Sequence, residues 1–165
     1  MDLSSLSSIA QIAAAVGVIV SLAFLGYEIR MTRLQAEHAN WRDLLQSLSD
    51  YKGITNDLPF AEFVTRAHTD YHALTDAEKL SFGGYMEQGI HVYANFYKHN
   101  ALLPGQIDGI DEAISNCLIE MLATPGGAAW WVENKARHRF RLGTYDAIDA
   151  VLRTASRDAS ASGKS

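Results

Sequence analysis

The chain has 165 residues, of which 48% are hydrophobic and 20% charged, and 14 Lys and Arg residues against 19 Asp and Glu residues give a formal net charge of −5. A chain of this size and apolar content can bury one core. Its acidic balance argues against nucleic acid as a partner, because nucleic-acid binding needs a basic surface. The single cysteine, Cys117, excludes an intramolecular disulfide framework and a multi-cysteine zinc site.

The N-terminal region is strongly apolar, with no charged or histidine side chain in the 25 residues from Leu3 to Tyr27. Within residues 9–27 only Gln11 and Ser21 carry polar side chains. A helix of that stretch would be about 28 Å long, close to the hydrocarbon thickness of a bilayer. We therefore expect a short tail over residues 1–8 and a transmembrane helix over residues 9–27.

Two alternatives to the transmembrane helix are a cleaved signal peptide and a buried core helix. The signal peptide is the weaker alternative, because the only charged side chain before the apolar run is Asp2, where a basic region is expected. After the span, basic side chains follow at Arg30, Arg33 and Arg42. By the positive-inside rule, this asymmetry places the rest of the chain in the cytoplasm.

The helix is expected to continue past the span to about Tyr51, since the first proline is Pro59. One side of it carries a stripe of mostly apolar residues at alternating steps of four and three: Tyr27, Met31, Leu34, His38, Trp41, Leu45 and Leu48. Such a heptad-like stripe must be buried against the chain's own domain or a second copy. Within the span, Ala13, Gly17 and Ser21 form a small-residue ridge, which is typical of helix contacts in lipid.

His38 interrupts this stripe between apolar neighbours. A polar residue at such a position can fix the register of a helix pair or respond to pH. The plainer interpretation is a ring that hydrogen-bonds within the domain or turns its edge to water. From the ridge and the stripe together we expect the first helix to be an interaction surface through which the chain self-associates.

The following segments predict a helical bundle domain over residues 28–155. Helix starts are indicated by Asp57 before Pro59, by a capping box at Thr75 and Glu78, and by Asp108, Thr124 and Thr144. Residues 156–165 contain only Ser, Ala, Gly and charged residues, and predict a disordered tail. No strand-like alternation occurs. The predicted fold is all-α, with an N-terminal transmembrane helix that continues into a cytoplasmic helical bundle.

Three histidines are the candidates for a metal site. His68 and His72 are spaced i, i+4, which places both imidazoles on one side of a helix, as in zinc-binding helices. His91 forms a second i, i+4 pair with Glu87. No Glu-x-x-His motif accompanies them, so the favoured interpretation is structural histidines, with no metal or other cofactor bound.

A basic cluster near the C-terminus contains Lys135, Arg137, Arg139 and Arg141. It could contact anionic lipid headgroups or a phosphate-bearing ligand. The alternative is a solvated helix end. Nucleophilic catalysis finds no support, because Cys117 is expected in the core and the chain has neither a Gly-x-Ser-x-Gly elbow nor a phosphate-binding glycine loop.

Two stretches, residues 27–33 (Tyr-Glu-Ile-Arg-Met-Thr-Arg) and residues 124–131 (Thr-Pro-Gly-Gly-Ala-Ala-Trp-Trp), resemble a loosely defined group of uncharacterised bacterial proteins. Members share one N-terminal membrane helix, an Ile-Arg pair after it, a helical domain, and a Pro-Gly turn before a double Trp. The group often has Gln where this chain has Glu28. The resemblance implies a bacterial inner-membrane protein and carries no catalytic residues.

These observations predict a membrane-tethered, non-enzymatic helical module that binds itself or a membrane-protein partner. The first alternative is a metal-dependent enzyme or metal sensor that uses His68, His72 and His91. The second is a sensor of a small ligand or lipid, held in the aromatic-rich bundle.

Overall fold

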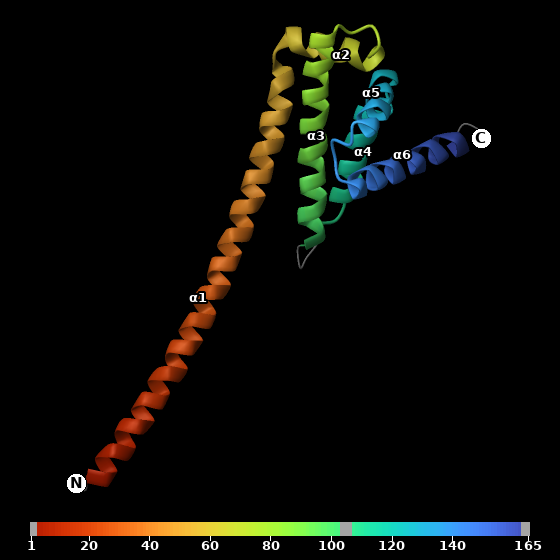
Figure 1. Ribbon diagram of the computed structural model, residues 1–165. Helices are drawn as coiled ribbons and strands as arrows, with labels where there is room; N and C mark the ends of the chain where they lie inside the picture. The colour runs from red at the N-terminus through yellow and green to blue at the C-terminus, as the bar shows by residue number, and fades with distance from the viewer. Residues whose placement is uncertain (1–2, 103–106, 163–165) are drawn as a thin grey trace. The chain divides into compact units, whose positions relative to one another are not determined.

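The computed structural model describes the backbone of residues 3–102 and 107–162, and the side chains of residues 11–12, 14–101 and 107–157. Over these ranges the chain is all-α, as the sequence predicts: it forms six α-helices and one short 3-10 helix, η1, and no strand (Figure 1). The chain divides into two compact units, Met1–Leu45 and Gln46–Ser165. We refer to the second unit as the helical domain.

The first helix, α1, spans Leu3–Gly53 and is therefore longer at both ends than the expected helix from about residue 8 to Tyr51. Of the expected tail over residues 1–8, residues 3–8 are helical and continuous with α1, and residues 1–2 lie outside the described chain. The second compact unit starts at Gln46, whereas the sequence predicts a bundle domain that starts at residue 28. Residues 28–45 share the first unit with the apolar segment.

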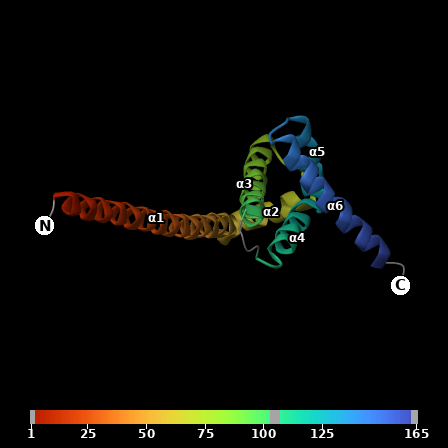
Figure 2. The same ribbon diagram turned by 90° about the horizontal axis from the view of Figure 1, so that it is seen from below.

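The helical domain is built from the last turns of α1 and the elements that follow. Their bounds are η1 Ile54–Asn56, α2 Leu58–Thr69, α3 Asp76–Leu102, α4 Ile110–Leu122, α5 Pro125–Ala136 and α6 Leu142–Ser162. Helix α4 is central, since it contacts α3, α5 and α6, while α2 packs on α5 (Figure 2).

Local capping signals place several helix starts where the sequence predicts them. The Asp57 carboxylate accepts the backbone N–H of Phe60 at 3.2 Å. Glu78 accepts the N–H of Thr75 at 2.8 Å, and the Thr75 hydroxyl accepts the N–H of Glu78 at 3.3 Å, which confirms the capping box. Each cap satisfies backbone donors that the first turn of a helix leaves unpaired.

The core of the domain centres on α3, whose Phe82, Met86 and Ile90 are 0% exposed. These residues recur every fourth position and so form one face of the helix. Phe96 is 6% exposed whereas the next residue, Tyr97, is 52% exposed, because successive side chains lie about 100° apart round the helix. Cys117, expected in the core, is only half-buried.

The last helix differs from the prediction at both ends. It begins at Leu142, before the expected cap Thr144, whose N–H already bonds to the carbonyl of Arg141 at 2.9 Å. It continues to Ser162, so the prediction of disorder is wrong for residues 156–162. No glycine or proline lies between residues 144 and 162, and the Ser156 hydroxyl donates to the Leu152 carbonyl at 2.8 Å within the helix. Residues 163–165 lie outside the described chain.

Candidate functional site

The apolar half of α1 exposes large hydrophobic side chains along its length, including Ile19 at 66% and Phe24 at 64%. Its most apolar 18-residue window has a mean hydropathy of 1.6, and none of that window is buried. By length and composition, α1 is the one helix in the described ranges that is long and apolar enough to cross a membrane. The absence of burial argues against the alternative of a soluble core helix.

The small-residue ridge lies within this apolar half. The side chain of Ala13 is outside the described residues, and Gly17 and Ser21 are exposed. The Ser21 hydroxyl donates to the Gly17 carbonyl at 2.8 Å, so its polar group is satisfied inside its own helix. Ser21 therefore needs no second helix as a hydrogen-bond partner. The ridge offers such a helix only a surface of small residues that permits close approach.

The stripe that follows the span is partly exposed. Leu34 is 41% and Leu45 48% exposed, and His38 is exposed as well. Trp41 and Leu48 are half-buried. Most of the apolar side chains of the stripe over residues 27–45 are thus exposed.

The three candidate metal ligands do not come together. Helix α2 ends at Thr69, because the carboxylate of Asp70 accepts the N–H groups of His72 and Ala73 at 3.0 and 3.2 Å and turns the chain. His72 therefore lies beyond the helix that carries His68, and the prediction of two imidazoles on one helix face is wrong.

His68 has a structural environment. Its Nδ1 lies 2.9 Å from the Thr124 hydroxyl, and its ring packs edge-on against Phe82. Burial lowers its pKa, since the charged ring would lose hydration. His91 is exposed on α3, with its ring 5.1 Å from that of Phe140. Across the described residues, no three His, Cys, Asp or Glu side chains lie close enough together to hold a metal ion.

The basic cluster is largely paired with carboxylates. Lys135 bonds to Asp149 at 2.5 Å, Arg137 pairs with Glu133, and Arg139 bonds to Glu87 at 3.0 Å. The fourth cation, Arg141, forms no ion pair with any described side chain. These pairs neutralise much of the charge with which the cluster could attract an anionic headgroup or a phosphate.

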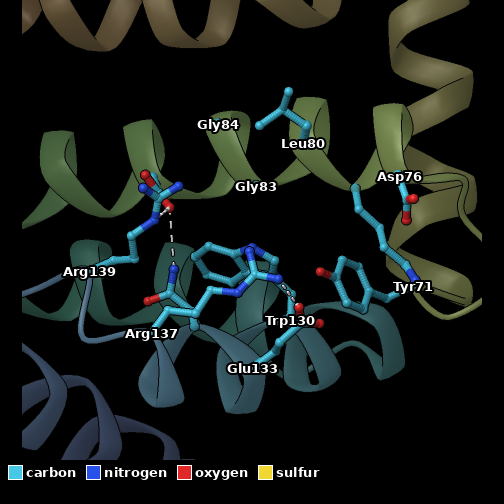
Figure 3. Close-up of a pocket in the computed structure, with 12 residues that line it drawn as sticks. Tyr71, Asp76, Leu80, Gly83, Gly84, Trp130, Glu133, Arg137 and Arg139 are labelled. Carbon is cyan, nitrogen blue, oxygen red and sulfur yellow. Dashed lines mark hydrogen bonds and ion pairs between the residues drawn. The ribbon is translucent and has the colours of Figure 1, made fainter.

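Part of this cluster borders the cleft shown in Figure 3, which has a volume of about 440 Å³ and lies between α3 and α5. On the α3 side the bare backbone of Gly83 faces the indole of Trp130, whose Nε1 would lie 3.3 Å from a methyl group placed at Gly83. Glycine there lets the two helices approach closely. This cleft was not predicted from the sequence.

The polar groups of the cleft pair mostly with one another. Lys79 lies 5.6 Å from the ring of Tyr71. Burial and a hydrogen bond to the Glu133 carboxylate raise the pKa of Tyr71 to about 12, so its hydroxyl stays protonated at neutral pH. Glu87 accepts from both Arg139 and Asn134. Such a cleft can admit a small polar molecule, but its side chains hold no activated nucleophile.

A second cavity, of about 240 Å³, contains the lone cysteine together with Tyr51, Tyr85 and Tyr93. Burial raises the pKa of Tyr51 and Tyr93, and Tyr93 is hydrogen-bonded to Cys117. The Tyr51 hydroxyl also bonds to the sulfur of Met121 at 3.4 Å. The cavity is therefore a polar gap between α1, α3 and α4 whose groups satisfy each other.

The chain matches no protein-family model, no curated protein and no solved structure.

Proposed function

We propose that the chain is a single-span protein of the bacterial inner membrane that holds its helical domain in the cytoplasm and acts as a non-enzymatic interaction module. The observation that carries the proposal is the unburied apolar half of α1, whose window of mean hydropathy 1.6 is covered by none of the chain's own residues. In water such a surface would be strongly unfavourable, whereas the interior of a bilayer accommodates it.

The charges support one orientation. Arg30, Arg33 and Arg42 follow the span, and residues 3–27 carry no charge. Basic residues near the end of a span stay on the cytoplasmic side during insertion. The helical domain, which follows them, would then be cytoplasmic.

The continuity of α1 supports an uncleaved anchor over a signal peptide. The helix continues from the apolar segment to Gly53 without interruption, and the apolar run ends at Tyr27 with no small-x-small cleavage site followed by polar residues. Tyr27 is suited to the interface between headgroups and hydrocarbon. An interaction role is supported by the exposed stripe after the span and by the largely self-paired polar groups in the domain's cleft.

Membrane fractionation of the full chain, tagged at both ends, tests the proposal. We expect it to resist carbonate extraction, to retain its N-terminal tag, and to show no alkaline phosphatase activity when that enzyme is fused to its C-terminus. Val18→Arg should release a substantial fraction of the protein, because a charge at mid-span costs about 2.5–3.5 kcal/mol for insertion. Ala39→Arg, outside the span, is the matched control.

Loss of the N-terminal tag would show a cleaved signal peptide and contradict the anchor. High activity of the C-terminal phosphatase would place the domain in the periplasm and contradict the orientation.

A further inference from the structure

The stripe along residues 27–45 has the spacing of a coiled-coil seam. Counting in heptads, Met31, His38 and Leu45 occupy a positions, and Tyr27, Leu34 and Trp41 occupy d positions. Most of these side chains are exposed, with Met31 at 37% and Tyr27 at 63%. The seam is therefore available to a second helix over about two and a half heptads.

The flanking charges favour a second copy of the same chain. Glu37 occupies a g position and Arg42 the e position five residues later. In a parallel pair of identical helices, each g residue faces the e residue of the next heptad on the partner, so Glu37 of one copy would face Arg42 of the other, twice per pair. Among the described residues, neither side chain forms an ion pair within its own chain.

The membrane anchor determines whether the two helices run parallel or antiparallel. This step rests on the proposed function, because two copies anchored by the same N-terminal span enter the cytoplasm with the same polarity. Their helices must therefore run parallel, which is the arrangement that brings Glu37 and Arg42 together. His38, the polar residue at an a position, would then meet His38 of the second copy and favour this register over shifted ones.

We propose that a second copy of this chain covers the stripe, forming a parallel two-stranded coiled coil over residues 27–45 directly beyond the membrane. Its contacts are the a and d side chains and the reciprocal pairs between Glu37 and Arg42. Within its own chain Trp41 is half-buried, whereas Leu34 is 41% exposed.

Disulfide cross-linking in native membranes tests this geometry. In a full-length Cys117→Ser background, Leu34→Cys places a thiol at a d position, and Ala36→Cys places one at an f position on the opposite side of the helix. A disulfide requires Cα atoms about 4.4–6.8 Å apart, a separation available across a seam and not between opposite faces. We expect at least tenfold more covalent dimer at position 34. Equal yields at the two positions, or no dimer at either, would overturn the proposal.

A charge exchange tests the partner and the register separately from the apolar contact. In the Leu34→Cys background, Glu37→Arg alone places a second cation opposite Arg42 of the other copy, and Arg42→Glu alone places a second carboxylate opposite Glu37. Each variant should form about tenfold less dimer with itself. Co-expressed with different tags, the two variants bring opposite charges together at both contacts of each mixed pair, so they should cross-link to each other more than either does to itself. Unchanged self-dimers, or no recovery on mixing, would contradict the parallel register.

Membrane fractionation of the same samples separates the two proposals. Protein that is integrated in the membrane with its domain cytoplasmic, and that gives no seam-specific dimer, refutes the coiled coil and leaves the anchor intact. Protein that is released by carbonate refutes the anchor.

Discussion

Glycines show how differently the two units of the chain are surrounded. A methyl group at Gly17 or Gly26 in α1 would meet no atom within 4 Å. In the helical domain, a methyl at Gly126 would lie 1.9 Å from the carbonyl oxygen of Ala67, and one at Gly127 would lie 2.2 Å from that of Met121. In the first unit these glycines have free space around them. In the helical domain, glycine is required at positions 126 and 127 because the backbone of another segment lies too close for a side chain.

Apolar side chains show the same contrast. Phe24 in α1 is 64% exposed, whereas Phe82 in α3 is fully buried. The domain has a buried apolar core, while the large apolar side chains described in the apolar half of α1 are exposed. A substitution in the domain should therefore change the folding of the chain, and a substitution in the first unit should change its association with the membrane or with other molecules.

The largest expected effect comes from Gly126→Ala, which tests whether the domain requires the backbone contact between α5 and α2. The added methyl cannot fit beside Ala67 without moving one of the helices, and we expect a loss of about 4 kcal/mol or more in the free energy of unfolding. Denaturant unfolding of the full chain in detergent, followed by tryptophan fluorescence, measures it.

The matched control for that substitution is Gly84→Ala on α3, where a methyl would meet nothing within 4 Å. Alanine in a helix interior should stabilise the domain there by about 0.5–1 kcal/mol. Equal destabilisation by the two substitutions would contradict a specific contact at Gly126.

Phe82→Ala tests the contrast between buried and exposed apolar residues. Removing a fully buried ring from α3 should lower the free energy of unfolding by about 3–5 kcal/mol, because it forfeits burial and leaves a cavity. Phe24→Ala is the control and should leave the unfolding of the domain unchanged. A comparable loss from Phe24→Ala would show that the apolar half of α1 belongs to the folded core.

Features set by neighbouring residues could be predicted from the sequence. The capping box at Thr75 and the start of α5 at Thr124 depend on contacts within three residues, and the structure has both. The all-α class followed from helical periodicity in the same way. The apolar span was evident from composition alone.

Features that depend on distant residues could not be predicted. Glycine is needed at position 126 because the backbone of Ala67, 59 positions earlier, lies against it. No residue near Gly126 in the sequence indicates that contact. The cleft between α3 and α5 combines Tyr71, Glu87 and Glu133 from separate segments. The end of α2 was missed for a different reason, since the Asx turn at Asp70 is local but competes with an i, i+4 histidine pattern that looks helical.

Asp149→Ala tests a polar contact inside the domain. Burial opposes ionisation of Asp149, but hydrogen bonds from Lys135 and Trp131 outweigh it and lower the pKa of the carboxyl. We expect the substitution to cost about 1–2 kcal/mol at pH 7. Asp146→Ala, at an exposed position on the same helix, should cost much less.

The lowered pKa of Asp149 also predicts how the effect of Asp149→Ala on the free energy of unfolding changes with pH. A carboxyl with a lowered pKa stabilises the fold above the pKa of the unfolded chain, about 3.9, and loses that contribution as the pH falls through the folded value. The difference between wild type and Asp149→Ala should therefore shrink below about pH 4. A difference that stays constant down to about pH 2 would show that the carboxylate charge contributes nothing.

The smallest expected effect concerns His68, which distinguishes a half-buried histidine of the domain from exposed ones such as His72. Burial lowers its pKa, so between the folded value and the unfolded value near 6.5 the unfolded chain binds more protons than the folded chain. The free energy of unfolding should therefore decrease as the pH falls below about 6.5, with a slope from this group of at most about 1.4 kcal/mol per pH unit. His68→Gln should remove that component between about pH 7.5 and 5.5, whereas His72→Gln, at an exposed position, should keep the wild-type dependence. If both variants follow the wild-type curve, ionisation of His68 is not coupled to folding, and its contact with Thr124 must persist when the ring is charged.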